Sequence, residues 1–236
     1  SHCLFTDDDA AAPMENLIRI MGAFRLARDP NLAISGTMIA REQPDKIWED
    51  SAVFDRVCHP DAHDVHLTDH KALSKFEFAR MAPSDSKFVY GGWWCFAFPI
   101  SGLRHDPFPF FLRGDDSAFC LSNEFTIRSL PGVFAVQDGF GVKEAPITRY
   151  LDMRYHLGHH LMHRGLEIGA VRSACVALRL ILRSVLRMHY AHAFAELAAW
   201  RSLFTGADCF QPDLDIASLG KQLASSHRME QWRAEA

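Results

Sequence analysis

Several features that mark whole classes of protein are absent from this sequence. Its 236 residues hold no uncharged apolar run long enough to span a bilayer, so no membrane-spanning helix is expected. The six cysteines are scattered without a Cys-x-x-Cys pair, which favours reduced thiols and a cytoplasmic protein over a disulfide framework. The net charge is −4, so no nucleic-acid partner is expected. No signal peptide, internal repeat or low-complexity tract is visible.

Apolar residues make up 48% of the chain, which is enough for a sizeable core, and charged residues make up an ordinary 23%. The pattern predicts a mixed α/β region over residues 1–148 and a helical region over residues 149–236. The chain opens directly in an apolar strand-like segment. We therefore expect a natural N-terminal part to be missing.

Apolar spacing predicts the individual elements. Strands are expected at 2–6, 31–40, 92–99, 108–113 and 128–136, and helices at 13–27, 117–125 and throughout 147–204. Residues 41–90 are polar and interrupted by prolines, so they are expected to have little regular structure.

The most informative stretch joins aromatic side chains to a pair of acids. Trp93 and Trp94 precede an apolar run, and Asp115 and Asp116 follow the next one. Because side chains alternate along a strand, one tryptophan is expected to pack inward and the other to face a cleft. Two adjacent carboxylates repel each other, so one of them is a candidate general base. The competing interpretation is that the acids cap a helix that starts near Ser117.

A second acidic cluster, Asp7, Asp8 and Asp9, follows the first short apolar segment. Hard divalent cations prefer such oxygen ligands, so the cluster is a candidate site for a metal that bridges donor phosphates. The competing interpretation is that these acids interact favourably with the N-terminus of the helix expected from Pro13.

The chain also contains 13 histidines, in two groups. One group is His59, His63, His66 and His70 beside Cys58, and the other is His156, His159, His160 and His163 on an expected helix. A zinc site is one interpretation of each group. Solvated or hydrogen-bonding histidines are the other.

Taken in order, four segments resemble family-2 inverting glycosyltransferases of the GT-A fold, and among these the galactofuranosyltransferases. The segments are Leu4–Asp9, Gly92–Pro99 with its two tryptophans, Pro109–Phe119 with the acidic pair, and Leu130–Gly132. The resemblance extends to about residue 165. It implies a partial GT-A mixed sheet that lacks its N-terminal nucleotide-binding strands, with a helical C-terminal region.

The resemblance also implies roles for individual residues. Asp7 and Asp9 match the carboxylates that hold Mn²⁺ or Mg²⁺ against the donor diphosphate, and Asp8 lies beside the donor. Asp116 matches the general base and Asp115 the residue that orients the acceptor. Trp93 and Trp94 match the aromatic platform beside the acceptor sugar.

The sequence departs from the family at the third metal ligand. The family places a histidine shortly after Leu-Pro-Gly, where this chain has Val136 and Gln137; Gln137 is a weaker ligand, and Asp138 beside it is an alternative. Asp152 and Tyr155 also stand where the family has histidine and asparagine.

The function implied is metal-dependent, inverting transfer of a sugar, such as galactofuranose, from a nucleotide-diphosphate donor (a UDP-sugar) to a glycan or lipid-linked glycan. The alternative is a carbohydrate-binding or scaffolding remnant without chemistry. A homo-oligomer and peripheral attachment at the inner face of the membrane are both compatible with this function. The helical tail either packs against the catalytic part or makes a subunit interface.

Overall fold

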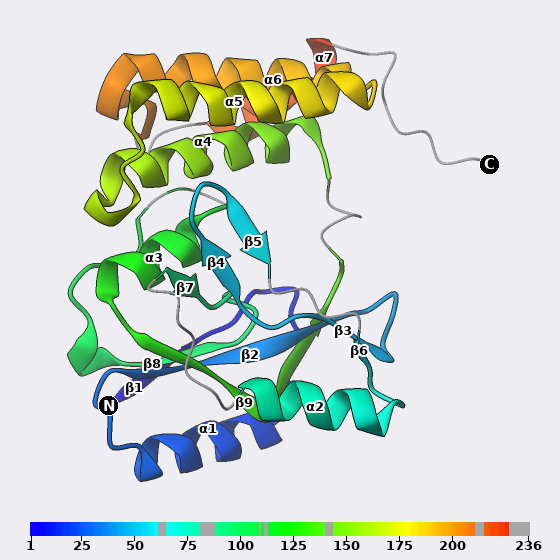
Figure 1. Cartoon of the computed structure of the whole chain (residues 1–236), viewed down its shortest axis with the longest axis vertical. Helices are drawn as coiled ribbons and strands as arrows, with labels where there is room; N and C mark the ends of the chain where they lie inside the picture. The colour runs from blue at the N-terminus through cyan, green and yellow to red at the C-terminus, as the bar shows by residue number, and fades with distance from the viewer. Residues whose placement is uncertain are drawn as a thin grey trace. The chain divides into compact units, whose positions relative to one another are not determined.

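The computed structural model describes residues 1–60, 65–80, 88–108, 110, 113–139, 144–210 and 215–226 (Figure 1). The chain forms two compact units. Unit 1 comprises residues 1–107 and 116–142, and unit 2 comprises residues 108–115 and 143–236. The mixed α/β class expected from the sequence is confirmed, whereas the division of function between residues 1–148 and 149–236 stays a prediction.

Unit 1 is built on a mixed six-stranded sheet. Its strands are β1 (His2–Phe5), β8 (Phe96–Pro99), β2 (Leu32–Ala40), β3 (Lys46–Glu49), β6 (Val65–His66) and β9 (Thr126–Gln137). The path runs β1-β8-β2-β3-β6, and β9 pairs with β2. The pairing of β2 with β9 is parallel, from Leu32 opposite Thr126 to Ala40 opposite Gln137. The other pairings of this sheet are antiparallel.

Strand β2 is the centre of the sheet. Every residue from Ala33 to Ala40 is buried, which is typical of a strand covered on both faces. The helix α1 (Glu15–Leu26) packs beside β9, and Ile20 of α1 joins a core with Ile34, Met38 and Val133. The expected strands at 2–6, 31–40 and 128–136 and the helix at 13–27 are therefore confirmed.

The prediction of little regular structure over residues 41–90 is wrong. Besides β3 and β6, this part holds β4 (Ala52–Phe54), β5 (Cys58–Pro60), β7 (Val89–Tyr90) and the helix α2 (His70–Arg80). Strands β5, β4 and β7 form a separate three-stranded sheet. These strands are two to four residues long. Such short segments are too brief to show a clear period in the sequence.

The predicted strand at 108–113 is also wrong for the residues that the structure describes. Phe108, Phe110 and Arg113 lie in no strand, while Pro109, Phe111 and Leu112 lie outside the described residues. Prolines at 107 and 109 remove two backbone donors, which disfavours a strand inside a sheet. The ring of Phe110 instead packs in unit 2, 5.2 Å from the ring of His159.

Unit 1 is completed by the 3-10 turn η1 (Ile100–Gly102) and the helix α3 (Asp115–Asn123), which leads into β9. Asn123 holds the end of α3 in place, because its side-chain oxygen accepts hydrogen bonds from the backbone N–H groups of Arg104 and His105 at 2.7 and 2.9 Å. The helix expected at 117–125 is thus present, beginning two residues earlier.

Unit 2 is helical, as expected. It contains α4 (Pro146–Met162), α5 (Gly169–Leu186), α6 (Tyr190–Ser202) and α7 (Ile216–Ser226), with 3-10 turns η2 (Arg164–Leu166) and η3 (Leu203–Phe210). Its core joins Leu151 and Leu157 of α4 to Ala177 of α5, Ala195 of α6 and Leu223 of α7. In the described part of the chain, no helix has both the length and the apolar content to cross a membrane.

Candidate functional site

The indole of Trp93 joins the two segments that carry the acidic clusters. Its ring centroid lies 4.8 Å from that of Phe5, the last residue of β1, and 5.8 Å from that of Phe119 on α3. The rings of Phe5 and Phe119 are themselves 5.5 Å apart. Asp7 follows Phe5 by two residues, and α3, which carries Phe119, begins at Asp115. The contacts of Trp93 therefore connect the segment that leads to the Asp7–Asp9 cluster with the helix that carries the acidic pair.

The strand expected at 92–99 begins only at Phe96, and the two tryptophans lie in the turn before it, so strand alternation does not apply to them. They nevertheless differ in exposure. Trp94 is 4% exposed, and its indole N–H donates a hydrogen bond of 2.6 Å to the carbonyl oxygen of Gly36. Trp93 is half-buried, and its indole nitrogen is buried without a hydrogen-bond partner among the described residues. Of the two tryptophans predicted to form the acceptor platform, Trp93 is therefore the one with surface exposed to solvent. A role for Trp94 in contact with a sugar stays a prediction.

The acidic pair lies in the first turn of α3. Asp116 accepts a hydrogen bond of 2.6 Å from the backbone N–H of Ser117. Both carboxylates are half-buried, so they are accessible at the positive end of the helix. The charge of Asp116, after the larger effect of burial, helps to raise the pKa of the Cys120 thiol above its ordinary value. The acids are therefore the first two residues of the helix and do not precede it as N-caps. A base role for Asp116 stays a prediction.

Gly114 fixes the entry of the chain into this helix. It has a φ of +85°, and an added Cβ would lie 2.3 Å from the Cβ of Tyr155. Both the left-handed backbone and the close contact require glycine at this position. The direction of the Asp115 backbone is therefore set by a residue that tolerates no side chain.

The cluster of Asp7, Asp8 and Asp9 lies in a turn between β1 and α1. Helix α1 begins at Glu15, and no side chain caps its N-terminus. The helix-dipole interpretation of the cluster is not supported, because that effect acts within the first turn. Asp7 is half-buried, and Asp8 and Asp9 are exposed.

Backbone pairing brings this turn close to Gln137. Ala11 forms an isolated antiparallel bridge with Val136, with both N–H···O distances at 2.9 Å. Ala11 follows Asp9 by two residues, and Val136 directly precedes Gln137. The third predicted metal ligand is therefore carried on a strand that is hydrogen-bonded to the segment following the acidic turn.

The side chain of Gln137 has an unused acceptor. It is 1% exposed, its amide nitrogen lies 3.4 Å from Sδ of Met38, and its carbonyl oxygen has no hydrogen-bond partner among the described residues. A buried acceptor of this kind suits an ion or a water. Asp138, the alternative ligand, instead accepts a hydrogen bond of 2.8 Å from Nε of Arg41.

The donors at hand are therefore hard oxygen atoms, which fit Mg²⁺ or Mn²⁺. In the described part of the chain, no three His, Cys, Asp or Glu side chains are grouped as a metal site. The set of Asp7, Asp9 and Gln137 has two carboxylates and an amide, so the metal itself stays a prediction.

The histidines of α4 are structural in the described geometry. Nδ1 of His160 lies 2.7 Å from the carbonyl oxygen of Leu166, and Nδ1 of His156 lies 2.6 Å from that of Asp152. Burial lowers the pKa of His156, His159 and His163. The described histidines do not supply the group of ligands that a zinc protein needs, and His63 lies outside the described residues.

An ion cluster beside the acidic pair was missed in the sequence. In unit 2, Asp152 lies 3.7 Å from Nε of Arg113 and 3.7 Å from Nη1 of Arg149, and Arg149 also contacts Glu144. Arg113 directly precedes Gly114 and the acidic pair. Its place directly before the acidic motif is the sequence feature that could have drawn attention to Arg113. Its ion pair with Asp152 becomes visible only in the folded chain.

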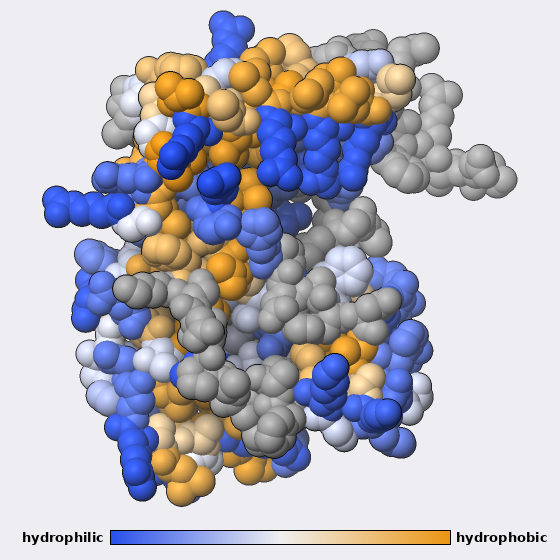
Figure 2. Space-filling model, viewed as in Figure 1, coloured by the Kyte–Doolittle hydropathy of each residue, from blue (hydrophilic) through white to orange (hydrophobic). Residues whose placement is uncertain are grey.

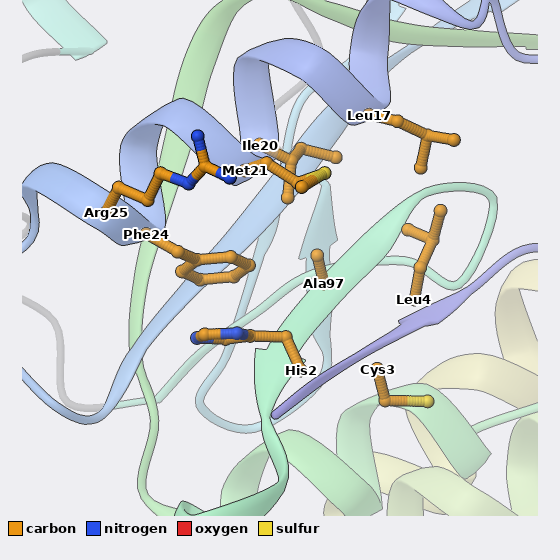
Figure 3. A pocket seen from close by; sticks show the side chains of 9 residues that line it. All are labelled: His2, Cys3, Leu4, Leu17, Ile20, Met21, Phe24, Arg25 and Ala97. Atoms are coloured by element: carbon orange, nitrogen blue, oxygen red, sulfur yellow. The ribbon is translucent and has the colours of Figure 1, made fainter.

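A pocket of about 400 Å³ lies elsewhere in unit 1, between α1 and the strands β1 and β8 (Figure 3). The rings of His2 and Phe24 stack there at 4.0 Å. The pocket is lined by His2, Cys3, Leu4, Leu17, Ile20, Met21, Phe24, Arg25 and Ala97. None of the predicted site residues is among them, so the cavity does not define the candidate site.

A glycosyltransferase is among the known proteins to which this chain is similar. The chain is 24% identical over 255 aligned positions to the galactofuranosyltransferase GlfT2 of Mycobacterium tuberculosis (strain ATCC 25618 / H37Rv), which includes 99% of this chain. The chain spans 38% of the length of that relative. No protein-family model matches the chain. The similarity indicates a glycosyltransferase-like relationship.

Proposed function

We propose that this chain forms the metal- and acceptor-binding part of an inverting glycosyltransferase of the GT-A type. The donor is a UDP-sugar, with galactofuranose as the first candidate, and the acceptor is a glycan or a lipid-linked glycan on the cytoplasmic side of the membrane. The observation that carries the proposal is the Trp93 ring, half-exposed and packed between the end of β1 and α3. Each of these elements leads to one acidic cluster.

Each acidic residue then has a distinct task. Asp116 accepts the proton of the attacking acceptor hydroxyl, and Asp115 orients the acceptor. The exposed part of the Trp93 ring offers a flat surface on which a sugar ring stacks. Inversion follows if the hydroxyl attacks the anomeric carbon from the face opposite the leaving diphosphate.

Asp7, Asp9 and Gln137 are the residues that would hold Mn²⁺ or Mg²⁺, with Asp8 beside the donor. The ion would neutralise charge on the leaving nucleotide diphosphate. The unused carbonyl oxygen of Gln137 supports its place in this set.

The proposal is tested by exchanging one carboxylate oxygen for nitrogen in each cluster. Asp116→Asn keeps the shape of the side chain but removes the base, so transfer from UDP-galactofuranose to a galactofuranose oligosaccharide should fall by about 10²–10⁴-fold. Donor binding, followed by calorimetry in the presence of Mn²⁺, should stay close to wild type. Asp9→Asn should weaken donor binding as well as transfer.

The matched control is Asp106→Asn, because Asp106 is an exposed acid of the same unit outside both clusters. It should leave transfer and binding unchanged. Near-normal transfer by Asp116→Asn would remove this residue from the mechanism. A full-length wild-type protein that binds the oligosaccharide but transfers nothing would favour the carbohydrate-binding remnant instead.

A further inference from the structure

The ion cluster of unit 2 lies at the entry to the helix that carries the acidic pair. Nε of Arg113 is 3.7 Å from one carboxylate oxygen of Asp152, and Nη1 of Arg149 is 3.7 Å from the other. Arg149 also contacts the carboxylate of Glu144. Each oxygen of Asp152 therefore faces a guanidinium group, and one of these groups belongs to the residue directly before Gly114.

Helix α4 holds the same short segment at a second point. An added Cβ on Gly114 would lie 2.3 Å from the Cβ of Tyr155, so the backbone of Gly114 lies directly against α4. Asp152 and Tyr155 are three residues apart, which places them on one face of this helix. Two consecutive residues, Arg113 and Gly114, are therefore held by one face of α4, the first through charge and the second through close packing.

The two acids of the proposed mechanism follow this held segment without a gap. Helix α3 begins at Asp115, and the carboxylate of Asp116 accepts a hydrogen bond of 2.6 Å from the backbone N–H of Ser117. Because glycine rotates freely, the φ of +85° at Gly114 has to be held by its surroundings. A residue that acts in catalysis has to be placed within about half an ångström of its productive position. The hold on the entry to α3 therefore bears on the placement of both acids.

The ion pair is shielded enough to hold a defined geometry. The side chains of Arg113 and Asp152 are 25% and 24% exposed. In unit 1, by comparison, those of Arg41 and Asp138 are 57% and 49% exposed. Exposed charges contribute little, because water screens them and their side chains move freely. The arginines of α5 are exposed in this way, and Figure 2 shows a row of hydrophilic side chains along one border of the largely hydrophobic α5–α6 surface.

We propose that Asp152 is a positioning residue for the acidic pair. Its carboxylate holds Arg113 while Tyr155 holds Gly114, so that α3 starts in the direction that presents the acidic pair to the acceptor. Asp152 and Tyr155 are both positions at which this chain departs from the family that it resembles, so the arrangement is a feature of this chain. The inference rests on the proposed function, because Asp152 has this task only if the acidic pair acts on an acceptor.

The test is the initial rate of transfer by the full-length protein, with the UDP-galactofuranose donor and the galactofuranose oligosaccharide acceptor varied separately. Asp152→Asn keeps the size of the side chain but removes its charge. We expect kcat to fall by roughly 10-fold to 100-fold, because a displacement of about 1 Å at a reacting group costs rate on this scale. The KM for the donor should stay close to wild type. Arg113→Gln, at the other end of the ion pair, should cause a loss of the same size.

Rescue and non-additivity separate positioning from general damage to the fold. Asp152→Glu keeps the charge, and the 3.7 Å spacing leaves space for the longer side chain to reach Arg113, so this variant should keep most of the wild-type kcat. Added to Asp116→Asn, Asp152→Asn should cause little further loss, because the base that it positions is already absent. A merely structural role would multiply the two losses instead. The matched control is Glu167→Gln, which removes an exposed acid of unit 2 and should leave transfer unchanged.

Hydrogen exchange supplies a measurement that needs neither donor nor acceptor. In Asp152→Asn the backbone N–H of Ser117 should exchange faster than in wild type, while the N–H groups of α7 stay unchanged. Circular dichroism checks that each variant is folded. Normal kcat in both Asp152→Asn and Arg113→Gln, beside the expected loss in Asp116→Asn, would overturn this inference, whether or not exchange is faster. Unchanged transfer in Asp116→Asn would instead overturn the proposed function on which the inference rests.

Discussion

The two units of the chain differ in the kind of polar group that each one buries. In unit 1, most buried polar side chains are neutral: Asn16 donates to the carbonyl oxygen of Phe134 at 2.6 Å, and Ser35 to that of Asp50 at 3.1 Å. The buried acids of this unit are Glu49 and Asp50, and the Asp50 carboxylate accepts a hydrogen bond of 3.2 Å from Thr37. In unit 2, the buried set is Arg154, His156, His159, His160, Ser184 and Glu196. Neutral groups pair without regard to pH, whereas buried histidines and acids make stability depend on it.

The units also differ in what they expose. Unit 1 presents carboxylates in turns and at the start of α3, where solutes reach them. Unit 2 presents leucines and arginines along α5. Unit 1 thus has carboxylates at its surface besides the buried Glu49 and Asp50, whereas unit 2 has charged groups in its core and a row of arginines along α5.

The largest effect is expected from the aromatic core of unit 1. The ring of Phe98 contacts those of Phe5 and Phe119 at 5.0 and 5.1 Å, and the residue is 2% exposed. Phe98→Ala should lower the free energy of unfolding by about 3–5 kcal/mol, because it leaves a cavity. Denaturant titration should give the same loss at mildly acidic and mildly alkaline pH. A loss that changes with pH would mean that unit 1 also relies on titrating groups.

Unit 2 should respond to acid. The pKa values of His156, His159 and His163 are lowered in the fold, chiefly by burial. Stability is therefore fully present above the ordinary pKa of 6.5 and is lost as pH falls toward the lowered values. Each such histidine contributes a slope of up to about 1.4 kcal/mol per pH unit. His159→Phe should reduce the slope of unfolding free energy against pH, with His105→Phe, an exposed site, as the control.

Glu196 should act in the opposite direction. Burial raises its pKa to about 7, although Ser184 donates a hydrogen bond of 3.0 Å to it. Because the folded pKa is raised above the ordinary value of 4.5, the carboxyl is least unfavourable at low pH and destabilises the fold as pH rises toward 7. Glu196→Gln should raise stability above pH 7 by about 1–2 kcal/mol after allowance for solvent screening. An unchanged thermal midpoint at alkaline pH would contradict this.

The smallest effect is expected at the proposed metal site. Gln137→His supplies a nitrogen donor and should tighten Mn²⁺ binding by roughly threefold to tenfold. Calorimetry with Mn²⁺ alone measures this change. The control is Gln43→His, at an exposed site of the same unit. If the affinity does not change, Gln137 does not face the ion.

Long periodic segments were predicted well from the sequence, because burial of one face dictates them. This applies to α1, to the helices of unit 2 and to β2 and β9. The short strands between residues 46 and 66 were missed, since they gain their stability from neighbours in the sheet rather than from a local pattern. The run at 108–113 was predicted to be a strand because it is apolar. Its Phe110 instead packs its ring against the rings of His159 and Phe210.

The contacts around the candidate residues were predicted only in part from the sequence. Trp93 and Trp94 differ in burial as expected, but they lie in a turn before β8, so the alternation of a strand is not the reason. The contact of Trp93 with Phe5 and Phe119 joins residues far apart in the sequence, and so does the bridge of Ala11 to Val136. Arg113 with Asp152 is a further pair of this kind. Only the fold reveals such pairs. The convergence of Asp7, Asp9 and Asp116 on one cleft stays a prediction.

The parallel pairing of β2 with β9 has a consequence for how fast the chain folds. Leu32 meets Thr126 only after the intervening strands and α3 have been gathered, so a long loop must close before the central pair of the sheet forms. Helices α4, α5 and α6 instead follow one another closely in the sequence, and α6 packs against both α4 and α5. Rates of folding fall as contacts become less local. We therefore expect the helical unit to reach its native contacts first, and the sheet to be the slow step in which aromatic surface is exposed to aggregation.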